Sequence, residues 1–78
     1  MTRTRTVYYT TYVSHEEFQN GVLPHFSKPF KTLAEAREFE KSLGDVNTQI
    51  ELNHEVWDRN EWHIDWDMGD SARKVVEE

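Results

Sequence analysis

Residues 48–68 read TQIELNHEVWDRNEWHIDWDM, and this stretch carries the strongest fold signal because it contains two runs of alternating apolar and polar side chains. The first run places the apolar side chains of Ile50–Val56 on one face, counting His54 with them, and the second does the same over Trp62–Met68. Alternation with period two is typical of half-buried β-strands. The stretch therefore predicts a β-hairpin.

The loop of this hairpin follows from the same alternation. A three-residue loop at Asp58–Asn60 pairs Val56 with Trp62 and places the apolar residues of both strands on one face. A two-residue loop would set Glu55 opposite Trp62 and mix the faces. Because a shift of one residue exchanges the two faces of a strand, we predict the three-residue loop.

A first strand is expected near the N-terminus. Residues 5–13, RTVYYTTYV, are almost all β-branched or aromatic, a composition that favours strands. Tyr8 and Tyr12 project to one face and Tyr9 to the other, so both faces carry aromatic surface. This pattern indicates an inner strand.

The segment 14–24 admits two interpretations. Ser14 and Glu17 have the spacing of a capping box, which predicts a short helical turn over 15–20. Alternatively, Asn20-Gly21 is a sequence typical of a tight hairpin turn. Both interpretations bring the chain back beside the first strand.

The returning segment, residues 25–31, is expected to form an edge strand. Pro24 and Pro29 flank or interrupt it, and proline has no backbone N–H to donate to a neighbouring strand. A strand with such residues has to lie at the border of the sheet.

The main helix is predicted over residues 32–44. Thr32 and Glu35 form a capping box, and Gly44 supplies the left-handed residue that ends helices. One face carries apolar residues at intervals of three and four, and a helix this short needs packing against a sheet to be stable.

The fold class predicted from this order is α+β, with one domain over residues 1–78. We expect a four-stranded antiparallel sheet in ββαββ order with one main helix on one face. Short helical turns are allowed at 15–20 and 71–77. A chain of this length offers surface for one core only.

Composition narrows the class of protein. The chain has no cysteine, which excludes disulfides, thiol catalysis and thiolate zinc sites. No apolar run reaches the length of a signal peptide core or a membrane span, and we expect a soluble, cytoplasmic protein without membrane contact. The glycines form no phosphate-binding loop, so P-loop and Rossmann chemistry are also excluded.

The formal charge of −6 is unevenly distributed. Residues 45–70 hold eight acidic side chains against Arg59 alone, and strand alternation assigns most of those in the hairpin to the sheet face opposite the helix. Large aromatic side chains among charges are typical of recognition surfaces. The predicted partner-binding residues are Glu51, Glu55, Trp57, Glu61, His63, Asp65, Asp67, Tyr8 and Tyr12.

This predicted face suggests a non-enzymatic protein that binds a protein with a basic surface. Such a partner would normally bind nucleic acid, and carboxylates would occupy the positions of phosphates. Direct binding of nucleic acid is not expected at this net charge. No cofactor and no catalytic residue is predicted.

Two alternative functions are suggested by other features of the sequence. The open face or the edge strand could join two copies in a homodimer, which would make the chain a structural module. In the predicted register Glu55 lies opposite His63, and with Asp65 these residues could bind a metal ion. An ordinary cross-strand Glu–His pair explains the same residues without metal.

The entry to the main helix, Phe30-Lys31-Thr32-Leu33-Ala34-Glu35-Ala36, resembles the helix entry of small bacteriophage accessory proteins. The resemblance covers the capping box and the helix formers around it. It implies a protein that inhibits a host macromolecule, such as a nucleic-acid-handling enzyme or a defence complex. It assigns no functional residue.

Overall fold

Two long strands form the centre of the computed structural model, which describes residues 3–76. Strand β1 (Thr4–Val13) pairs antiparallel with β3 (Asn47–Asp58) along its whole length. The remaining elements are α1 (His15–Gln19), β2 (His25–Phe26), α2 (Leu33–Ser42), β4 (Glu61–Ile64), the 3₁₀ segment η1 (Trp66–Ala72) and β5 (Arg73–Val76). The chain is thus an α+β protein with a curled antiparallel sheet, as the sequence predicts at this level.

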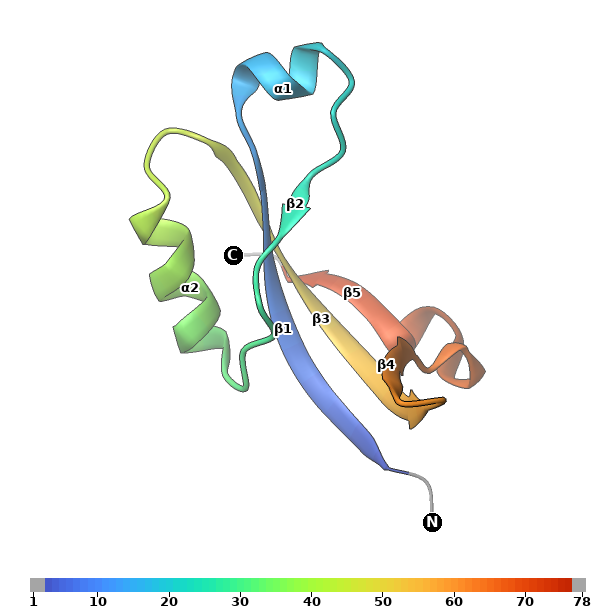
Figure 1. The fold of residues 1–78 in the computed structure, drawn as a ribbon. Coiled ribbons are helices and arrows are strands. Elements are labelled where there is room, and N and C mark those ends of the chain that lie inside the picture. The colour runs from blue at the N-terminus through green and yellow to red at the C-terminus, as the bar shows by residue number, and fades with distance from the viewer. Residues whose placement is uncertain (1–2, 77–78) are drawn as a thin grey trace.

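The sheet has the order β2-β1-β3-β4, and β5 also pairs with β3. Because β1 occupies one side of β3, strands β4 and β5 lie one after the other along its opposite side (Figure 1). Over residues 3–76 the sheet therefore contains five strands where four were predicted. Strand β2 lies at the border, which confirms the edge position expected from the prolines.

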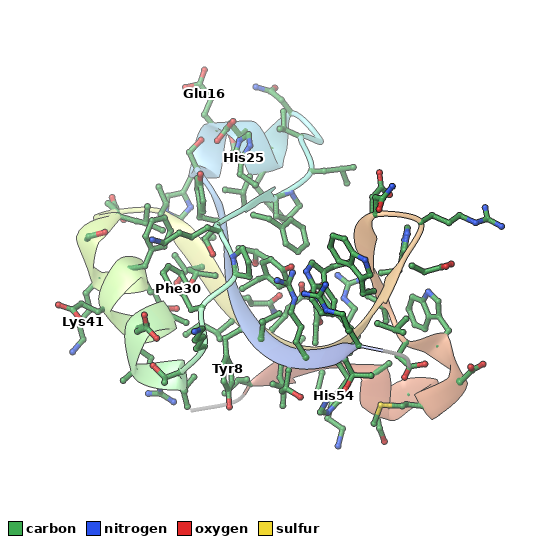
Figure 2. The ribbon with its side chains drawn as sticks, turned by 60° about the horizontal axis from the view of Figure 1, so that its bottom comes forward. Tyr8, Glu16, His25, Phe30, Lys41 and His54 are labelled. Carbon is green, nitrogen blue, oxygen red and sulfur yellow. The ribbon has the colours of Figure 1, made fainter. Side chains whose placement is uncertain are left out.

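Helix α2 packs on one face of the sheet near its middle. The Thr32 hydroxyl accepts the Glu35 N–H at 3.2 Å and caps the helix, and Gly44 has the expected positive φ of 78° just past its end. Ala36 is buried with Ile50 and Phe30, and Tyr8 packs against this cluster. Figure 2 shows Tyr8 and Phe30 next to α2. The apolar face predicted for this helix is confirmed.

Segment 14–24 contains a helix, so the capping-box interpretation is confirmed and the Asn-Gly hairpin is wrong. The Ser14 hydroxyl accepts the Glu17 N–H at 3.1 Å, and the Glu17 carboxylate accepts the Ser14 N–H at 3.2 Å. These two bonds fix the first turn of α1.

Within residues 3–76 no helix is long and apolar enough to cross a membrane.

The predicted three-residue loop of the second hairpin is wrong. Trp57 pairs with Trp62 and Asp58 with Glu61, which leaves a two-residue loop. Both loop residues, Arg59 and Asn60, have positive φ, as in the type I′ turn that matches the twist of a hairpin. The tryptophan pair provides apolar packing on the face that the sequence argument assigned to charged residues.

The second half of this hairpin also departs from the prediction. Strand β4 ends at Ile64, and Trp66 and Met68 lie exposed in η1 where core residues were expected. Gly69 adopts φ 65° and ψ −142°, a conformation essentially reserved for glycine, and it redirects the chain. Strand β5 then pairs with Ile50–Asn53, so the helical turn allowed at 71–77 is wrong over Arg73–Val76, while Ser71 and Ala72 form the end of η1; residue 77 lies outside the described residues.

Candidate functional site

The face of the sheet opposite α2, called the open face below, contains only part of the predicted binding surface. Glu51, Glu55 and Trp57 lie on it, as the sequence predicts, because they alternate with Ile50 on the helix side. Tyr8 pairs with Leu52 in the sheet, and this register places it and Tyr12 on the helix side. The prediction that both tyrosines share a face with the glutamates is therefore wrong.

The remaining predicted residues are distributed over two other places. His63 pairs with Val56 and not with Glu55, so it lies on the helix side of the sheet, where its ring is 3.6 Å from the Glu61 carboxylate. Asp65 precedes η1 as its N-cap residue and Asp67 lies within it. The predicted metal ligands Glu55, His63 and Asp65 are thus not assembled, and the described residues contain no cluster of three metal-ligating side chains.

The open face does not present free carboxylates. Glu55 is only 5% exposed; its carboxylate accepts one hydrogen bond from Arg5 Nε at 2.7 Å and another from the Tyr9 hydroxyl at 3.0 Å. Glu51 is equally buried and accepts from Arg73. Cross-strand pairing with arginines from β1 and β5 neutralises both carboxylates, so the expectation of an exposed acidic face is wrong for these two residues.

Tyr9 has a raised pKa in this environment. Burial is the largest cause, followed by the hydrogen bond to Glu55 and the charge of that carboxylate; the nearby Arg5 guanidinium acts in the opposite direction. The neutral hydroxyl is therefore the form that the folded protein favours. It serves as a hydrogen-bond donor that holds Glu55 in place.

An aromatic and arginine cluster lies at the loop end of the open face. Trp57 and Trp62 meet edge to face with ring centroids 5.2 Å apart. The Arg3 guanidinium lies over both rings, and the Arg5 guanidinium lies 4.3 Å from the Trp62 centroid. These cation–π contacts cover this end of the sheet and leave Trp57 half-buried.

The other end of the open face is hollowed. A cavity of about 370 Å³ is lined by Thr11, Leu23, Pro24, Phe26, Gln49, Glu51 and Arg73. A second cavity of about 340 Å³ adjoins it, because both share Thr11, Pro24 and Gln49, and it reaches Val13 and Phe18. Together the two cavities form a groove, called the open-face groove below.

The walls of the open-face groove are apolar and exposed. Leu23 is 82% exposed, and Phe18 and Phe26 are each more than half exposed. All three belong to the segment from α1 to β2, which lies beyond the end of β1 and then returns beside this strand (Figure 1). Clustered exposed apolar side chains beside a groove are typical of binding surfaces.

The floor of the groove contains an unusual polar group. Glu51 Oε2 is buried and has no hydrogen-bond partner among the described residues, and the same holds for Asn53 Oδ1 two positions along β3. Buried acceptors are nearly always hydrogen-bonded in proteins. These two oxygens therefore mark the part of the open face where a bound donor would be most favourable.

Several groove residues were missed in the sequence because their signals are not local. The sequence predicts only a connection and an edge strand for Leu23, Pro24 and Phe26. It predicts a helical turn at Arg73. Pairing of β5 with β3 brings Arg73 to Glu51, and no spacing in the sequence indicates that contact.

Comparison with known proteins provides no relative from which a function could be transferred. No family model, no curated protein and no solved structure matches this chain. The geometry of the open face is consequently the basis for a functional assignment.

Proposed function

We propose that this chain is a non-enzymatic protein-binding domain whose binding surface is the open-face groove and its walls. The observation that carries the proposal is the exposure of Leu23, Phe26 and Phe18 around one groove. Apolar side chains of this size are normally buried, and a group of them at a concave site favours a protein partner. Glu55 lies outside the groove lining, and its pairing with Arg5 is typical of a structural ion pair.

The partner in this proposal is a protein with a basic surface. The chain has a formal charge of −6, so long-range attraction favours a positively charged partner and accelerates the encounter. A host nucleic-acid-handling or defence protein, inhibited in the cytoplasm by a phage-type accessory protein, is the partner class suggested by the helix entry. In the proposed function, recognition depends on contacts in the open-face groove and on general charge attraction. It does not depend on carboxylates that occupy the positions of phosphates, which is the mode that the sequence suggests.

The proposal is tested with two variants of the purified protein. Leu23→Ser combined with Phe26→Ser removes the apolar walls, while Trp66→Ser changes an equally exposed aromatic residue in η1 at the other end of the sheet. Proteins captured from bacterial lysate by the unmodified chain are identified, purified and titrated calorimetrically against all three forms. We expect the double variant to weaken binding about 10- to 30-fold and Trp66→Ser to leave it unchanged.

Other results would contradict the proposal. Equal affinity of the double variant and the unmodified chain would exclude the groove walls as the binding surface. Sedimentation showing a dimer that the double variant abolishes would assign the groove to a second copy of the chain. Higher salt should slow association with a basic partner, and an unchanged rate would remove the charge argument.

A further inference from the structure

The buried carboxylate at the floor of the open-face groove is satisfied on one side only. Arg73 donates from Nε at 2.8 Å and approaches from Nη2 at 2.7 Å, and both contacts go to the same oxygen, Glu51 Oε1. The other oxygen, Oε2, is buried without a partner. A carboxylate can accept on both oxygens, so Glu51 retains the capacity for a further charge-assisted hydrogen bond.

A second unused acceptor lies on the same face. Asn53 is 4% exposed, and its Oδ1 has no hydrogen-bond partner among the described residues. Side chains two positions apart on a strand project to the same side, so both acceptors serve the same region of the open face. Two neighbouring acceptors with no donor indicate a binding site for a group that carries several N–H donors.

The cavity above Glu51 has apolar walls. Leu23, Pro24 and Phe26 line one side, and Arg73 lines the cavity with its side chain 47% exposed. An apolar wall leading to a buried carboxylate matches a side chain with an aliphatic stem and a cationic end. Lysine and arginine have this construction, and the cavity volume of about 370 Å³ accommodates either.

We propose that this cavity binds a basic side chain, lysine or arginine, of the partner protein. This inference rests on the proposed function, because it specifies what the partner inserts into the open-face groove. The aliphatic stem packs on Leu23 and Phe26, and the cationic end donates to Glu51 Oε2; Asn53 lies two positions along β3, outside the cavity lining. Since Oε2 is covered in the free protein, a side chain next to it has to move when the basic side chain enters.

The inference is tested directly with small cations. The full chain labelled with ¹⁵N is titrated with n-butylguanidinium, with n-butylammonium, and with 1-pentanol as an uncharged control of similar size. We expect a dissociation constant of about 1–10 mM for at least one cation, a value appropriate to a ligand of this size. The largest amide shifts should map to β3 around Glu51, to Leu23–Phe26 and to Arg73.

Two variants separate the cationic end from the stem. Glu51→Gln removes the charge and should weaken cation binding at least 10-fold, while Glu61→Gln, an exposed control, should not change it. Leu23→Ser lies on the surface, so it should leave the fold intact and weaken binding about 2- to 5-fold through the lost stem contact. If Glu51→Gln fails to fold, Leu23→Ser still tests the site.

The outcomes distinguish this inference from the proposed function. If 1-pentanol binds as well as the cations, or if the amide shifts are confined to other faces of the protein, the proposal that the cavity binds a basic side chain would be overturned. A partner that depends on Leu23 and Phe26 but binds Glu51→Gln normally would overturn the inference and leave the proposed function standing. Cations bound in the cavity without any partner that uses the groove walls would contradict the proposed function and support the cavity chemistry.

Discussion

The substitution Glu55→Gln tests whether the carboxylates of the open face support the fold or recognise a partner. In the structure Glu55 is buried and accepts hydrogen bonds from Arg5 at 2.7 Å and from Tyr9 at 3.0 Å. Glutamine keeps the shape but offers one acceptor instead of two and removes the charge that faces Arg5. We therefore expect a less stable protein with the same fold.

The size of the effect follows from these contacts. A hydrogen bond to a buried charged group contributes about 1.5–3 kcal/mol, and glutamine retains a weaker neutral version of one of the two. The Arg5 side chain is partly exposed, so solvent screens its part of the interaction. We expect a loss of about 2 kcal/mol in the free energy of unfolding. For a domain of this size that corresponds to a decrease of about 8–16 °C in Tm.

The assay is urea unfolding followed by tryptophan fluorescence, with Trp57 and Trp62 next to the altered residue. The matched control is Glu61→Gln, whose side chain is 73% exposed; it should change stability by less than about 0.5 kcal/mol. Equal losses in the two variants would refute the structural role of Glu55. If the Glu55→Gln protein is as stable as the unmodified chain but no longer binds its partner, the result would support the prediction that an acidic face recognises the partner.

Absorbance at 295 nm gives a second readout of the same contact. The Tyr9 pKa is raised by burial first, and then by the hydrogen bond and charge of Glu55. Because the folded-state pKa lies above the unfolded value, the stability contribution is complete below about pH 10 and decreases as the pH rises through the folded pKa. Glu55→Gln should lower this pKa, and an unchanged titration would contradict the assigned contact.

Two other contacts and one turn conformation give separate predictions. Thr10 is fully buried and its hydroxyl donates to a carbonyl of α2 at 2.8 Å, so Thr10→Val should lower the free energy of unfolding by about 1 kcal/mol in urea titrations, and Thr10→Ser should retain this bond. The Glu17 pKa is lowered by its hydrogen bond to His25 and by its bonds to Ser14, so the stability it contributes is present above the ordinary glutamate pKa and lost as the pH falls through the folded value. An NMR titration of the Glu17 carboxyl checks this shift, and a midpoint at the ordinary value would contradict the contact. Arg59→Gly should stabilise the hairpin by about 0.5 kcal/mol, because Arg59 has positive φ in the two-residue turn; destabilisation would instead favour the three-residue loop.

Local patterns in the sequence predicted the elements whose signals are short-range. The capping box at Ser14 and the N-cap hydroxyl of Thr32 position the two helices, and the alternation around Ile50 assigns the helix-facing side of β3. The alternation pattern predicts a three-residue loop at Asp58–Asn60 only if all apolar residues of the hairpin share a face. In the structure the paired tryptophans occupy the opposite face and pack against arginines, which removes that requirement.

The candidate site depended on pairings between distant segments. Glu51 and Glu55 were correctly assigned to the face opposite the helix, but their burial depends on Arg73 and Arg5, which β5 and β1 bring to them. Tyr8 was assigned to the wrong face because the β1–β3 register cannot be obtained from either strand alone. Because side chains alternate between the two faces of a strand, a shift of one residue in the pairing moves every side chain of that strand to the opposite face of the sheet.

Composition and local spacing are enough to predict a small α+β domain with one capped main helix, a central run of alternating residues and a strong acidic bias in the second half of the chain. These properties depend on composition and on spacings of two to four residues, which the covalent chain fixes. The tertiary structure decided which carboxylates are neutralised, which aromatic residues share a face and where the groove lies. Those features depend on contacts between residues as far apart as 50 positions, as in the Arg5–Glu55 pair, and they form only when the strands pair in one register.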